Sequence, residues 1–83
     1  MNQKAAALRE SILKLENGEA LWTSLFNCAI DLIKKKCDLA IAKDSKEKKD
    51  AALSAQEKYR KAIKNIKKNG INFVISEFDF MRT

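Results

Sequence analysis

The chain contains no histidine and no proline, and only two glycines and two cysteines occur among its 83 residues. Histidine is the commonest general base and metal ligand in proteins, so its absence removes the usual centre of acid–base catalysis and of metal binding. Because Gly18 and Gly70 lie far apart, the chain has neither a glycine-rich phosphate loop nor a nucleophile elbow. The composition therefore predicts a protein that is not an enzyme, with no catalytic residues, no metal site and no cofactor.

The two cysteines, Cys28 and Cys37, are too far apart on one helix to form a disulfide, because nine residues correspond to about 13.5 Å of helical rise. We interpret both as buried thiols that act as small apolar residues. The longest uncharged stretch of the first half, residues 20–30, is much shorter than the roughly 20 residues of a membrane span. Residues 1–19 carry a charge every few positions, unlike a signal peptide. These features predict a cytoplasmic protein without a membrane contact.

Apolar residues recur at three- and four-residue spacing in two long stretches, a pattern typical of one face of a helix. Between them, residues 43–50 are all charged or hydroxylic, and Asp44 or Ser45 is placed to cap the second helix. The sequence therefore predicts a single all-α domain over residues 1–83, built as an antiparallel helical hairpin. Its expected parts are an N-terminal helical segment over 3–17, long helices over about 20–43 and 46–69, and an apolar segment over 71–81.

A turn near residue 44 or 45 brings residues whose numbers sum to about 88 or 89 to the same level of the two helices. Ile33 then lies opposite Ala55, a pairing of large with small residues that allows helices to approach to about 8–10 Å. Gly18 and Gly70 also fall at one level. Either both helices end there, or both continue and cross closely.

Residues 71–81 form the most apolar part of the chain, with seven apolar residues in eleven. The spacing of Ile71, Ile75 and Phe78 fits a helix, whereas the alternation from Phe78 to Phe80 suits a strand. We favour a helix, because a single strand in an all-helical chain has no partner. We expect this tail to pack on the N-terminal segment.

Apolar residues outside the main stripes indicate that a second chain completes the core. A domain of this size buries only about 60–65% of its unfolded surface, so we expect a homodimer that forms a four-helix-type bundle. The candidate self-association residues are Leu21, Leu25, Leu32, Leu39, Leu53, Phe78 and Phe80.

The formal net charge is +6, and residues 34–69 hold 13 basic and five acidic residues. One interpretation is a solvated helix face; the other is contact with nucleic-acid phosphates, which we do not favour because 14 lysines accompany only three arginines. The candidate contacts are Lys58, Arg60, Lys61, Lys64, Lys67 and Lys68.

The pattern over residues 20–69 resembles the ROP-type helical hairpins, which dimerise into four-helix bundles. That resemblance implies binding of paired RNA loops, with Arg60, Lys61, Lys64 and Lys68 as the contacts; ROP-type chains lack the apolar tail found here. A fainter similarity, through the run from Tyr59 to Ile66 before an apolar end, is to type III secretion needle subunits and their hairpin chaperones, although Asp44–Glu47 replaces their proline-bearing hinge. Both similarities suggest a small bacterial protein.

Three functions are consistent with the sequence. The first is a helical interaction or scaffold module of unknown partner that self-associates through apolar helix faces. The second is an RNA- or DNA-binding regulator that uses the lysine-rich face, and the third is a hairpin chaperone or adaptor for another helical protein.

Overall fold

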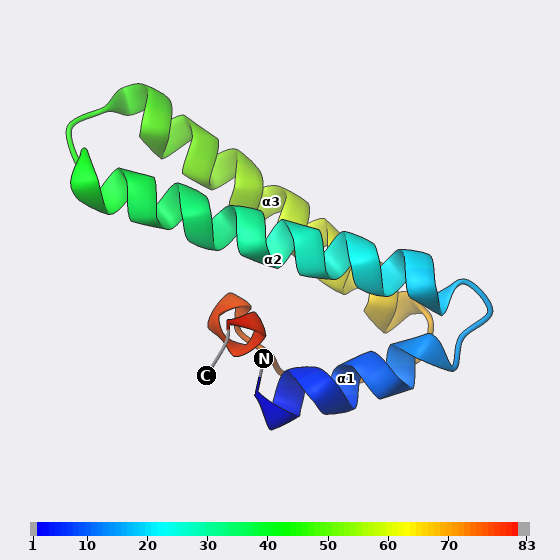
Figure 1. Ribbon diagram of the computed structural model, residues 1–83. Helices are drawn as coiled ribbons and strands as arrows, with labels where there is room; N and C mark the ends of the chain where they lie inside the picture. Colours follow the sequence, from blue (N-terminus) through cyan, green and yellow to red (C-terminus); the bar gives the residue numbers. More distant parts are fainter. Residues whose placement is uncertain (1, 82–83) are drawn as a thin grey trace.

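The computed structural model describes residues 2–81 and is all-helical over that range, with no strand. Its elements are α1 (Gln3–Leu13), α2 (Gly18–Ile41), α3 (Lys46–Lys68) and a short 3-10 helix, η1 (Glu77–Phe80). Helices α2 and α3 lie side by side and run in opposite directions, while α1 and η1 lie on one side of the pair (Figure 1). The predicted all-α class is confirmed. The two long helices begin and end within two residues of their predicted bounds, but the N-terminal helix ends at Leu13 rather than residue 17.

The helix starts follow from capping groups in the sequence. Ser45 Oγ accepts a hydrogen bond from the Lys48 backbone N–H at 3.3 Å, so Ser45 rather than Asp44 caps α3. At the start of α1, Asn2 Oδ1 accepts from the Ala5 N–H at 3.1 Å. These side chains satisfy N–H groups that the first turn of a helix leaves without a partner.

Both glycines lie where a helix begins or ends, which decides between the two alternatives that the sequence left open. A Cβ atom on Gly18 would lie 1.9 Å from the backbone oxygen of Ile12, so only glycine permits the close approach between the start of α2 and the end of α1. Gly70 follows the end of α3 with a φ of +89°, a left-handed conformation that glycine adopts without steric cost. The chain therefore turns at both positions.

The tail is extended over residues 71–76, so the helix predicted over 71–81 is wrong for most of its length. Half-buried side chains alternate with exposed ones along this segment, and the half-buried ones, Ile71, Phe73 and Ile75, pack against the core. This period of two allows the chain to cover the helices without forming a sheet. Only the last turn, η1, is helical, and Ser76 Oγ caps it by accepting from the Phe78 N–H at 3.3 Å.

The core lies between the helix pair, α1 and the tail. Phe80 is only 2% exposed, and its ring lies against those of Trp22, Phe26 and Tyr59 at centroid distances of 5.5, 6.2 and 6.5 Å. Helix α1 contributes buried apolar side chains from its inner face, and η1 contacts α1 as expected for a tail that packs on the N-terminal segment. Helix α2 thus faces three neighbours, which are α3, α1 and the tail.

Candidate interaction surfaces

The residues predicted to mediate self-association lie in three different environments. Leu25, Leu32 and Phe80 are at most 2% exposed and belong to the core of the chain. Leu21 and Leu39 are half-buried, whereas Leu53 and Phe78 are 65% and 53% exposed. The expectation that all seven form one free apolar surface is therefore corrected. The physical reason is that α2 packs against three elements, so its buried arc is wider than a single helix–helix contact requires.

The loop end of the helix pair extends past the tail and α1. We call this part, residues 34–57, the arm; it consists of the end of α2, the loop at 42–45 and the start of α3. Figure 1 shows α1 and η1 beneath the other part of the pair, toward the end where α2 begins. Of the described elements, a cross-section through the arm therefore contains only α2 and α3, whereas the rest of the molecule also contains α1 or the tail.

A groove of about 580 Å³ runs along the arm between α2 and α3. Its floor is apolar and its rim is mostly basic. The lining residues are Lys36, Leu39, Ala40, Lys43, Asp44 and Lys49. Outside this groove the arm exposes two more large apolar side chains, Ile41 at 85% and Leu53 at 65%. Leu53 lines a separate hollow on α3 with Gln56, Glu57 and Arg60. The arm thus carries apolar surface that no described part of this chain covers.

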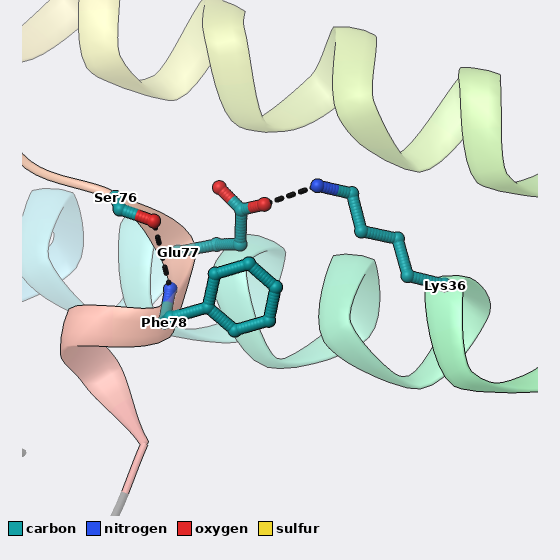
Figure 2. Close-up of polar contacts among 4 residues, drawn as sticks. All are labelled: Lys36, Ser76, Glu77 and Phe78. Atoms are coloured by element: carbon teal, nitrogen blue, oxygen red, sulfur yellow. Dashed lines mark hydrogen bonds and ion pairs between the residues drawn. The ribbon is translucent and has the colours of Figure 1, made fainter.

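Lys36 connects this groove to the tail. Its Nζ forms an ion pair with Glu77 and lies 5.4 Å from the centroid of the Phe78 ring (Figure 2). Burial raises the pKa of Glu77, but the hydrogen bond from Lys36, a backbone hydrogen bond and the charge of Lys36 together outweigh that effect and leave the pKa below its ordinary value. Because Lys36 also lines the groove, the groove and η1 lie on the same side of the helix pair.

The six predicted nucleic-acid contacts are all exposed on α3. At about 100° per residue, five of them fall within an arc of about 120° opposite the buried stripe that contains Tyr59. We call these five the basic ridge; they are Arg60, Lys61, Lys64, Lys67 and Lys68. Lys58 lies on the flank of the helix, outside the ridge.

The basic ridge is not neutralised within the described structure. Among residues 2–81, the ion pairs join Lys35 to Asp31 and Lys36 to Glu77, and neither involves the ridge. Lys67 Nζ lies 5.5 Å from the centroid of the Phe73 ring, a cation–π contact that holds this ammonium against the tail. The ridge is therefore a cationic surface that faces solvent.

The sequence pattern alone does not identify the lysines of the groove or the tail carboxylates as interacting residues. Lys36 stands in a run of three lysines that reads as a solvated face, and its contacts depend on residues about 40 positions later in the chain. Glu77 and Asp79 alternate with phenylalanines, which indicated a strand pattern rather than capping. The Ser76–Asp79 spacing, which resembles a capping box, is the signal that would have identified η1.

The cysteines differ in environment. Cys28 is half-buried against the core, whereas Cys37 is exposed on the arm, so the prediction of two buried thiols is wrong for Cys37. Within residues 2–81, no group of three or more Cys, Asp or Glu side chains is arranged to hold a metal ion. No helix in that range combines the length and apolar character needed to cross a bilayer.

Comparisons of the chain with models of protein families, with curated proteins and with solved structures find no significant match.

Proposed function

We propose that this chain is a non-enzymatic helical interaction module that self-associates through the arm. The observation that carries the proposal is the groove over Leu39 and Ala40, on an arm that also exposes Ile41 and Leu53. Apolar side chains with this exposure gain free energy when a partner removes them from water, at about 25 cal/mol per Å². The proposed occupant of the groove is the arm of a second copy.

The rest of the molecule supports a second helix pair as the occupant. Toward the start of α2, the chain covers the same side of the α2–α3 pair with its own tail and α1. A second arm packed on the groove would complete the arm in the same way, because two helix pairs make a four-helix cross-section. In this proposal α2 and α3 act as a hairpin, and the dimer is the four-helix-type bundle that the sequence pattern and the ROP-type resemblance predict.

The charges of the arm are compatible with pairing to an identical surface. In a two-fold contact, each residue meets the same patch of the other copy, so a surface of one sign repels itself. The arm holds seven basic and five acidic residues, and both signs occur at the groove, with Lys43 and Lys49 beside Asp44. Because Lys36 is already paired with Glu77, Lys43, Lys49 and Asp44 leave one unbalanced positive charge per groove, a small repulsion that apolar burial has to exceed.

Sedimentation equilibrium at micromolar protein tests the proposal. The wild-type chain is expected to sediment as a dimer, and the double variant Ile41→Lys, Leu53→Lys as a 9.4 kDa monomer. Both positions are exposed, so these variants keep the helical circular dichroism of the wild type. Val74→Lys is the matched control, because Val74 is 90% exposed but lies in the tail, away from the arm. A monomeric wild type, or equal effects of arm and tail lysines, contradicts self-association through the arm.

A further inference from the structure

Positive charge on α3 is concentrated in its C-terminal half. Residues 58–69 contain six basic and no acidic residues, in contrast to the mixed charges of the arm. Lysines near a helix C-terminus interact favourably with the helix dipole. This interaction accounts for Lys67 and Lys68, which lie in the last turn. The dipole does not account for Arg60, Lys61 and Lys64, which lie before that turn.

The carboxylates of the tail do not serve as partners for the ridge. Glu77 is paired with Lys36, and Asp79 accepts hydrogen bonds from Asn2 and Ser76. Glu57, one helical turn before Lys61, marks the end of the ridge nearest the arm. The basic ridge therefore has no anionic partner within the described residues and is able to bind an external polyanion.

We propose that the basic ridge binds the phosphate backbone of a nucleic-acid duplex. From Arg60 to Lys68 the ridge is about 12 Å long, and one strand of a duplex carries roughly three to four phosphates over that length. Four of the five side chains are lysines, whose ammonium groups contact phosphates as point charges. The proposed binding is therefore independent of base sequence and sensitive to salt.

The surroundings of the ridge favour a duplex over two other polyanions. Single strands are held by exposed aromatic side chains on which bases stack. Tyr59 is 5% exposed and faces the core, and Phe73, next to Lys67, is half-buried against the core. Helices that lie in an anionic membrane surface gain much of their affinity by inserting large apolar side chains. Between residues 58 and 69, all of which the structure describes, every exposed side chain is polar or charged.

This inference goes beyond the proposed self-association and depends on different residues. The ridge occupies the end of α3 remote from the loop at 42–45, whereas the groove lies beside that loop. An arm variant without added charge, Ile41→Gln, Leu53→Gln, leaves the five ridge residues in place. It is expected to bind duplex even as a monomer, so the failure of one proposal is distinguishable from the failure of the other.

Fluorescence anisotropy with labelled duplex DNA and duplex RNA, each at about 50 and 200 mM salt, tests the proposal. About four phosphate contacts predict a slope of about −3.6 for log affinity against log salt, which is roughly a 150-fold loss between the two conditions. The triple variant Arg60→Gln, Lys64→Gln, Lys68→Gln is expected to lower this slope by about three and to weaken low-salt binding by at least about tenfold.

The control is a triple variant with the same net charge whose changes lie outside the ridge. Its substitutions are Lys14→Gln, Lys34→Gln and Lys48→Gln, all at exposed positions. It is expected to keep most of the salt slope. The proposal is overturned if the wild type does not bind duplex at low salt, or if both triple variants lose affinity equally. It is also overturned if anionic lipid vesicles or single strands are bound more tightly than duplex.

Discussion

Asn2 and Asp79, which lie 77 positions apart, are joined by two hydrogen bonds. The Asn2 backbone N–H donates to the Asp79 carbonyl oxygen at 3.0 Å, and Asn2 Nδ2 donates to Asp79 Oδ1 at 2.6 Å. Each residue also caps a helix, because Asn2 Oδ1 accepts from the Ala5 N–H and Asp79 Oδ2 accepts from the Ser76 N–H. One pair of residues thus fixes the start of α1 and η1 together, and so holds the tail over the core.

The charge of Asp79 is expected to make this link sensitive to acid. Hydrogen bonds from the Ser76 backbone and the Asn2 side chain lower the pKa of Asp79, so its contribution to stability is complete above the pKa of the unfolded chain. That contribution is lost as the pH falls through the folded-state pKa. Asp79→Asn removes the titration, so we expect its thermal midpoint to fall less than that of the wild type between about pH 7 and pH 3.

The matched control for Asp79→Asn is Asp50→Asn, which neutralises an exposed carboxylate on α3. Differential scanning calorimetry across the acid range compares the three chains. If Asp79→Asn follows the wild-type pH dependence as closely as Asp50→Asn does, the link between the chain ends is not electrostatically important.

The two glycines are expected to respond differently to alanine. In Gly18→Ala, the new Cβ would lie 1.9 Å from the Ile12 oxygen, so the backbone must shift, at a cost of about 2 kcal/mol or more. In Gly70→Ala, nothing lies within 4 Å of the new atom, and the cost is the left-handed φ alone, about 1–2 kcal/mol. Chemical denaturation measures the free energy of unfolding of both variants. If Gly18→Ala loses no more stability than Gly70→Ala, the close approach of α1 and α2 at Gly18 is contradicted.

Tyr59 contains a buried hydroxyl that has no hydrogen-bond partner within the described structure. Leaving such a group unpaired costs about 1–3 kcal/mol, so Tyr59→Phe is expected to keep or raise the free energy of unfolding at neutral pH. Burial, followed by the charges of Glu77 and Asp79, raises the pKa of Tyr59 well above its ordinary value. The stabilisation from the neutral phenol is therefore complete below about pH 10 and is lost as the pH rises through the folded-state pKa.

Tyr59 is the only tyrosine in the chain, so tyrosinate absorbance reports its ionisation directly. In the folded wild type we expect this absorbance to appear only at a pH above that of free tyrosine, together with loss of helical circular dichroism. Tyr59→Phe should unfold at higher pH than the wild type, and ionisation at the ordinary pH without unfolding would contradict burial of the phenol.

The sequence predicted the long helices well because their signal is local. The three- and four-residue spacing of apolar side chains and the polar stretch at 43–50 place both helices, and the large-to-small pairing of Ile33 with Ala55 is consistent with their joint burial. These features depend on neighbours along one helix or across one contact. They need no knowledge of the tail.

The tail and the free surface could not be predicted in the same way, because both depend on where the tail docks. The alternation in 71–76 becomes meaningful only when Phe73 and Ile75 pack against a core formed by residues far away in sequence. The sequence pattern places Leu25 and Leu32 outside the contact between α2 and α3, but both are buried because α2 packs against three elements. The candidate self-association surface shifted accordingly, from seven residues spread over α2, α3 and the tail to the arm.

Docking of the tail is expected to depend on Phe80. This side chain is 2% exposed, and its ring lies within 6.5 Å, between centroids, of three aromatic rings of α2 and α3. Phe80→Ala should lower the free energy of unfolding by about 3–5 kcal/mol, because the cavity it leaves adds to the lost burial. Phe78→Ala is the matched control. Because Phe78 is 53% exposed, its replacement should lower the free energy of unfolding by less than about 1 kcal/mol. Urea denaturation measures the free energy of unfolding of both variants. The fluorescence of Trp22 reports the transition, because its ring centroid lies 5.5 Å from that of Phe80. Similar losses of stability in the two variants would show that the tail does not depend on Phe80 to cover the core.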